Sequence, residues 1–145
     1  MKKTRAAVIK EIGDIGERLV QSSLQRYHKN VVLSENKFDS VKDMMADGET
    51  IEVKTLVKIK IHNAFCIGSS QIAKCMNVDR LFFVHIAYGD SVDIYEAIKP
   101  RTPFNRWFNQ DECYFFELTD LKLYDRVQDK DAAARLRELT PSNYL

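Results

Sequence analysis

Apolar residues recur at helical spacing close to the N-terminus. Those that stand three or four positions apart are Val8, Ile12, Ile15 and Leu19. This period predicts an amphipathic helix over about 4–28, in which Gly13 and Gly16 mark either close packing or a break. The short apolar run 31–33 predicts a strand, and the polar residues 34–40 predict a loop.

The middle of the chain has the pattern of strands. Asp47-Gly48 is typical of a two-residue hairpin turn between two short strands. Residues 56–67 then alternate loosely between apolar and polar. The serine pair at 69–70 offers an N-cap for a helix through about Met76.

The continuous apolar run 81–87 is typical of a buried central strand, and 92–98 alternates like a neighbouring strand. After a proline-containing loop, 104–108 predicts a short aromatic-rich element and 113–118 predicts another strand. Asp129 stands at the N-cap of a last helix that ends at about residue 139.

This order of helix, strands, helix, strands and helix indicates an α/β or α+β fold. We expect a mixed central β-sheet flanked by helices. The chain has 145 residues and contains no repeat or linker, so we expect a single domain over 1–145.

Composition narrows the choice of compartment. No apolar run is long enough to cross a bilayer, and the basic N-terminus is not followed by a secretory apolar segment, so we expect an intracellular, cytoplasmic protein without a membrane partner. The three cysteines have no zinc or thioredoxin spacing and are expected to be reduced and mostly buried. Net charge is +1 at pH 7, so any contact with nucleic acid is expected in a local groove or across an oligomer.

The predicted turn fixes which residues face each other across the hairpin. A two-residue turn places Asp43 directly opposite Glu52, with Cβ atoms roughly 5 Å apart. Lys54, two residues beyond Glu52, points to the same face. The other face is apolar and suits a core; its residues are Met44, Ile51 and Val53.

Two like charges directly opposite each other destabilise a hairpin, so a further group must compensate Asp43 and Glu52. A divalent cation would do so, and carboxylate oxygens at this spacing suit Mg²⁺ or Mn²⁺. Such a cation lowers the pKa of a bound water and binds a phosphate oxygen. Lys54 would hold that water and offset the charge that develops on the phosphate. The three residues therefore favour phosphodiester hydrolysis.

The same residues resemble a known motif. Asp43, eight intervening residues and Glu52-Val53-Lys54 look like the Asp…Glu-X-Lys core of the PD-(D/E)XK nuclease superfamily. This superfamily includes restriction enzymes, repair nucleases and archaeal-type Holliday junction resolvases.

Two further segments extend the resemblance over about 13–84. Residues 16–20, Gly-Glu-Arg-Leu-Val, resemble the first-helix motif of the resolvase-like and restriction-like branches. Residues 69–72 and 79–83 look like the helix and strand that follow the catalytic lysine in some members.

The resemblance implies a restriction-endonuclease-like core and a Mg²⁺-dependent endonuclease. Asp43 and Glu52 would bind the metal, together with the carbonyl group of Val53. Lys54 would act on the attacking water. Glu17 would support this metal or a second one.

Several assignments have plainer alternatives. Asp39 competes with Asp43, although the hairpin pairing favours Asp43 and a turn suits Asp39. Glu17 has the alternative of a solvent-facing helix charge. The resemblance places Gln71 against metal-bound water or phosphate, whereas a polar residue in the first turn of a helix is the simpler interpretation.

Outside this motif, Lys58 and Lys60 lie on one strand face and either contact phosphates or form a solvated edge. The aromatic residues of 104–108 are expected to pack in a core rather than to stack on bases.

DNA is the expected substrate, and RNA is not excluded. Alternatives are a nicking repair nuclease, an RNA-directed nuclease, and a non-catalytic nucleic-acid-binding or assembly protein that retains the fold. A homodimer is compatible with this interpretation, because resolvases and many restriction enzymes cut two strands with two sites.

Overall fold

The computed structural model describes residues 4–27, 30–34, 43–55, 58–59, 63–86, 89–108 and 111–140. Helix α1, Arg5–Gln25, begins at Thr4, whose hydroxyl accepts a hydrogen bond from the backbone N–H of Ala7. Its buried side is formed by Gly16, Leu19, Val20, Ser23 and Leu24. The helix predicted at the N-terminus is therefore confirmed.

A six-stranded sheet forms the centre of the molecule, and its order is β1-β2-β3-β6-β7-β10. Its strands are β1 (Val31–Leu33), β2 (Met44–Ala46), β3 (Glu49–Thr55), β6 (Arg80–Ile86), β7 (Ser91–Glu96) and β10 (Lys122–Gln128). Strands β3 and β6 are parallel and the other neighbours are antiparallel, so the sheet is mixed, as the sequence predicts.

A second, four-stranded antiparallel sheet has the order β4-β5-β9-β8. It consists of β4 (Lys58–Ile59), β5 (Ala64–Gly68), β9 (Asp111–Glu117) and β8 (Phe104–Phe108). The sequence predicts one sheet, so this division is a correction. The second sheet forms because β5 pairs with β9. These two strands are distant in sequence, so a local pattern cannot show that they are partners.

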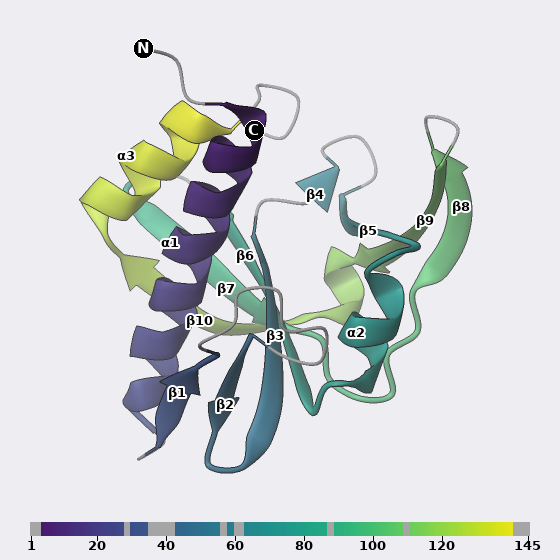
Figure 1. Ribbon diagram of the computed structural model, residues 1–145, viewed down its shortest axis with the longest axis horizontal. Coiled ribbons are helices and arrows are strands. Elements are labelled where there is room, and N and C mark those ends of the chain that lie inside the picture. The colour runs from purple at the N-terminus through teal and green to yellow at the C-terminus, as the bar shows by residue number, and fades with distance from the viewer. Residues whose placement is uncertain are drawn as a thin grey trace.

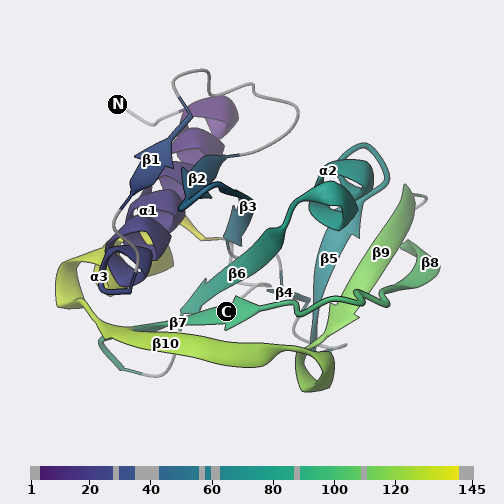
Figure 2. The ribbon, with the colours of Figure 1, turned by 90° about the horizontal axis from the view of Figure 1, so that it is seen from below.

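The helices lie on both faces of the six-stranded sheet, as Figures 1 and 2 show. Helix α1 and helix α3 (Lys130–Leu139) cover one face. Helix α2 (Ile72–Asn77) and the second sheet cover the other. The described chain is thus a mixed α/β protein with three helices. None of these helices is long and apolar enough to cross a membrane.

Two apolar cores follow from the alternation of side chains along β6. Phe82 and Val84 face α1 and α3, whereas Leu81 and Phe83 face α2 and the second sheet. Phe83 stacks on Phe65 of β5, with ring centroids 4.6 Å apart. Strand β6 is buried on both sides, which confirms the central strand predicted from its apolar run.

Three local expectations need correction. Gln71, rather than the serine pair before it, is the N-cap of α2, and its side chain makes no capping hydrogen bond. Strand β10 was not expected, because its alternation is weak and its side chains are exposed or half-buried. Trp107 of β8 is 70% exposed and does not pack in a core.

Candidate functional site

The tight turn predicted between β2 and β3 is present. Asp47 and Gly48 both have positive φ values, 48° and 87°, as a two-residue turn of this type requires. Met44 pairs with Ile51, in the predicted register. The turn therefore sets the register of β2 and β3, but the predicted direct pairing of Asp43 with Glu52 is wrong, because Asp43 stands against Ile51.

Asp43 lies immediately before β2 and bends toward β3. Its backbone N–H donates to the carbonyl of Ile51 at 2.8 Å, so two consecutive residues, Asp43 and Met44, stand against Ile51. The Asp43 carboxylate accepts a hydrogen bond from the backbone N–H of Val53, Oδ2 to N, at 2.8 Å. This contact holds the carboxylate beside β3.

Glu52 and Lys54 share the face of β3 that is covered by α2. Lys54 Nζ lies 3.3 Å from Glu52 Oε2. It also donates a hydrogen bond to Gln71 Oε1 at 2.9 Å. Gln71 is exposed at the start of α2, so this end of the site opens to solvent. Four of the predicted residues, Asp43, Glu52, Lys54 and Gln71, are brought together.

Lys74 of α2 stands between the two carboxylates. Its Nζ lies 3.3 Å from Asp43 Oδ1 and 3.3 Å from Glu52 Oε1. Burial by itself lowers the pKa of Lys74, but the charges of Asp43 and Glu52 outweigh burial and raise the pKa above its usual range. The sequence pattern predicts that a divalent cation compensates the repulsion between Asp43 and Glu52. In the structure, Lys74 offsets that repulsion.

Glu52 is completely buried, and neither of its oxygens receives a hydrogen bond from any described residue, although both ammonium groups are close. Burial, followed by the hydrogen bond and the charge of Asp43, raises the pKa of Glu52 to about 8, and Lys54 and Lys74 lower it only in part. The protonated form shares a hydrogen bond with Asp43, whereas the oxygens of the ionised form face the ammonium groups of Lys54 and Lys74, each 3.3 Å away.

Cys75 lies beneath the site and is fully buried. Burial raises the pKa of its thiol to about 12, so it is a neutral packing group. Cys66, Cys75 and Cys113 are all free thiols, as expected.

The carbonyl group of Val53 points to the side of β3 on which Asp43 lies. The N–H and C=O groups of one strand residue point to the same side, and the N–H of Val53 donates to Asp43. This is the side away from β6 and toward β2.

Glu17 is placed differently from the other acidic residues. It is half-buried on α1, which covers the opposite face of the sheet from Glu52 and Lys54. In the part of the chain that the structure describes, no group of three or more His, Cys, Asp or Glu side chains is arranged to hold a metal. Glu17 therefore does not join Asp43 and Glu52 in such a group. Asp39 and Lys60 lie outside the described residues.

The chemistry of the donors fits a small, hard cation. Mg²⁺ is usually bound by one or two carboxylates together with waters and substrate phosphates, so Asp43 and Glu52 suffice as its protein side-chain ligands. The two buried oxygens of Glu52 that receive no hydrogen bond from a described residue are the observation that supports this fit.

The reach of Lys74 into the site was missed by sequence reasoning. It stands three positions after Gln71, so the two residues share one face of a helix. That spacing is the signal that was available, but it becomes informative only once α2 is known to pack over β3.

No protein-family model, no curated protein and no solved structure matches this chain. The function is therefore inferred from the geometry of the site.

Proposed function

We propose that this protein is a Mg²⁺- or Mn²⁺-dependent endonuclease that hydrolyses DNA phosphodiester bonds on a restriction-endonuclease-like core. The observation that carries the proposal is the convergence of Asp43, Glu52 and Lys54 at one end of β3, with Glu52 buried and without hydrogen-bond donors among the described residues. The helix and the central strand that follow Lys54, α2 and β6, also agree with the resemblance.

Each residue of the site has a separate task. Asp43 and Glu52 would hold the cation, with the Val53 carbonyl beside them. The cation, when bound, would polarise a phosphate oxygen and lower the pKa of a bound water. Lys54, with a 19% exposed side chain, stands at the open side, where its ammonium group orients the water and stabilises charge on the phosphate. Gln71 fixes the direction of Lys54 through their hydrogen bond.

A non-catalytic protein that retains this fold is the second candidate. It is favoured by the contact of Lys74 with both carboxylates, because an internal ammonium group already compensates them without a metal. A buried carboxylate that lacks hydrogen-bond donors among the described residues is not explained by that alternative, since a purely structural site would satisfy both oxygens.

The first prediction concerns Lys54. Purified wild-type protein should cleave at least one substrate from a panel of supercoiled, linear, single-stranded and four-way-junction DNA, together with RNA, when Mg²⁺ or Mn²⁺ is present. Lys54→Met should lower the cleavage rate roughly 100-fold or more and leave DNA affinity and folding nearly unchanged, because this lysine acts on the transition state. Gel assays and circular dichroism measure the two effects.

Lys130→Met is the matched control, because Lys130 is exposed at the start of α3 and remote in sequence from the site. Its preparation should retain wild-type cleavage, and the loss of cleavage in a Lys54→Met preparation purified in parallel excludes a contaminating nuclease. A wild-type protein that cleaves nothing with either cation, or a Lys54→Met protein that cleaves normally, would refute the proposed activity.

A further inference from the structure

The position of Lys74 is more specific than that of a general neutralising charge. Its side chain is 15% exposed and its ammonium nitrogen is equidistant, at 3.3 Å, from one oxygen of each carboxylate. Lys54, by contrast, approaches the other oxygen of Glu52 and donates its hydrogen bond to Gln71. The two lysines therefore have different places in the site.

Lys74 contacts the same two carboxylates that a bound cation would need. Asp43 and Glu52 would hold a divalent ion through the same carboxylate groups that Lys74 contacts. An ammonium group in the same place excludes that ion by charge and by volume. It also does not satisfy Glu52, whose two oxygens receive no hydrogen bond from any described residue.

We propose that Lys74 occupies the divalent-cation position of the metal-free protein, so that cation binding requires its side chain to move out. This inference rests on the proposed metal site, and it assigns to that site an internal competitor. Movement is feasible because lysine has a long flexible stem and only its tip contacts the carboxylates. Lys74 keeps the two acidic groups compensated until the metal replaces it.

The test compares Mn²⁺ affinity by calorimetry, on the full chain, in four proteins. Lys74→Met removes the competing charge and should bind Mn²⁺ at least about tenfold more tightly than wild type. Lys74→Arg keeps a cation, can contact both carboxylates, and should bind Mn²⁺ no more tightly than wild type. Lys54→Met is the matched control, because it removes an ammonium group that contacts Glu52 but not Asp43. Its gain in Mn²⁺ affinity should be smaller than that of Lys74→Met.

A second readout follows Lys74 itself. Labelling with an amine-reactive reagent, quantified by mass spectrometry, should modify Lys74 slowly in the metal-free protein and several-fold faster when Mn²⁺ is present. Lys130, an exposed lysine, should label at the same rate in both states.

The outcomes separate this inference from the proposed function. Equal Mn²⁺ affinity of wild type and Lys74→Met, or weaker binding by Lys74→Met with circular dichroism unchanged, overturns the competition while the metal site stands. If Lys74→Met does not fold, faster labelling of wild-type Lys74 with Mn²⁺ still supports the competition, and an unchanged rate overturns it. Absence of Mn²⁺ binding in every protein overturns the metal site itself, and with it both proposals.

Discussion

At the scale of single residues, Glu52 is a costly side chain to keep in its place. An ionised carboxylate that is removed from water and poorly paired costs several kcal/mol. Glu52 has no exposed surface, and the ammonium groups of Lys54 and Lys74, each 3.3 Å from one of its oxygens, compensate its charge only in part. Part of this cost is avoided when Glu52 holds a proton, and that makes the stability of the protein depend on pH.

Glu52 should make the metal-free protein less stable as the pH rises from about 4.5 to about 8. Its pKa is near 4.5 in the unfolded chain and is raised to about 8 in the folded protein. Between these values the folded protein keeps a proton that the unfolded chain has lost. The free energy of unfolding therefore decreases with pH, by at most about 1.4 kcal/mol per pH unit.

Glu52→Gln cannot ionise, so urea unfolding in EDTA at a series of pH values should show a smaller decrease for this variant than for wild type. Glu49→Gln, an exposed substitution on the same strand, should keep the wild-type slope. Identical slopes for wild type and Glu52→Gln would show that Glu52 is ionised throughout this range.

The residues of the site were predictable to different degrees. Glu52 and Lys54 follow from a turn and from alternation along a strand, which are local properties. Asp43 lies beside them as expected, but it stands against Ile51 rather than against Glu52. Lys74 does not follow from local properties, because its contact with the carboxylates depends on how α2 docks on β3, a tertiary property. Glu17 lies on the predicted helix, but that helix covers the face of the sheet opposite Glu52 and Lys54. A helical period alone cannot show which face of a sheet a helix covers.

At the scale of elements, helix α1 lies very close to β3 at Gly16. A Cβ atom at this position would meet Thr55 Oγ1 at 1.8 Å and Thr55 Cβ at 2.9 Å, so glycine is needed for the contact. Thr55 follows Lys54 on β3, so the contact with Thr55 fixes the position of α1 relative to the strand that carries the site. At Gly13, one turn earlier, a Cβ atom would have no heavy atom within 4 Å beyond its own helix backbone and chain neighbours.

The two glycines of α1 should respond in opposite directions to replacement by alanine. Gly13→Ala should raise the free energy of unfolding by up to about 1 kcal/mol, because alanine is the better helix former and space is free. Gly16→Ala should lower it by roughly 1–3 kcal/mol, because the clash with Thr55 separates α1 from β3. Urea unfolding followed by circular dichroism measures both.

Gly13→Ala serves as the control for the helix propensity of the new residue. Gly16→Ala should in addition weaken Mn²⁺ binding, because the displaced end of β3 carries Glu52, a proposed metal ligand. A stabilised Gly16→Ala protein would mean that α1 and β3 are less tightly packed than the structure shows.

Elements with a strong local pattern were predicted, and those defined by distant pairing were not. The hairpin, the central strand β6 and the capped helix α3 follow from turn, hydrophobic and capping signals. The second sheet depends on the pairing of β5 with β9, nearly fifty residues apart by their register, Cys66 with Phe115. Strand β10 is half-exposed at a sheet edge, where few apolar positions mark a strand.

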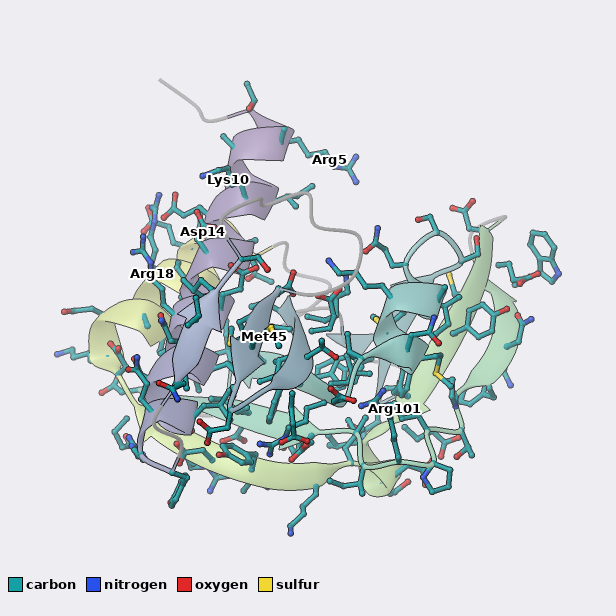
Figure 3. The ribbon with its side chains drawn as sticks, turned by 60° about the horizontal axis from the view of Figure 1, so that its bottom comes forward. Arg5, Lys10, Asp14, Arg18, Met45 and Arg101 are labelled. Carbon is teal, nitrogen blue, oxygen red and sulfur yellow. The ribbon has the colours of Figure 1, made fainter. Side chains whose placement is uncertain are left out.

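At the scale of the whole molecule, Arg101 joins the parts that surround the site. It is 8% exposed and follows β7, and Figure 3 shows it beside α2, away from Lys10 and Asp14 on α1. Its guanidinium group donates hydrogen bonds to five backbone carbonyls, those of Cys75, Met76, Val78, Asp79 and Ala97. Four of these belong to the end of α2 and the turn after it, so one side chain anchors the helix that carries Gln71 and Lys74.

A reciprocal contact ties the same turn to β3. The backbone N–H of Thr50 donates to Asp79 Oδ2 at 2.8 Å, and the N–H of Asp79 donates to the Thr50 hydroxyl at 3.0 Å. Helix α2 is therefore held to β3 and to the segment after β7 at once. The distance between Lys74 and the carboxylates of β3 is a consequence of both attachments.

Arg101→Lys should lower the free energy of unfolding by roughly 2–4 kcal/mol, because an ammonium group has three donors and leaves buried carbonyls of α2 unsatisfied. Amide hydrogen exchange should accelerate in α2 more than in α1, and Mn²⁺ affinity should rise, because Lys74, which competes with the cation, is displaced together with the helix. Far-UV circular dichroism is the suitable probe of unfolding, since the single tryptophan, Trp107, is 70% exposed and reports little on burial. Arg106→Lys, an exposed replacement on β8, is the matched control and should leave all three measurements unchanged. If Arg101→Lys is as stable as wild type and exchanges its α2 amides at the wild-type rate, then α2 is held by its apolar contacts alone and Arg101 does not position the site.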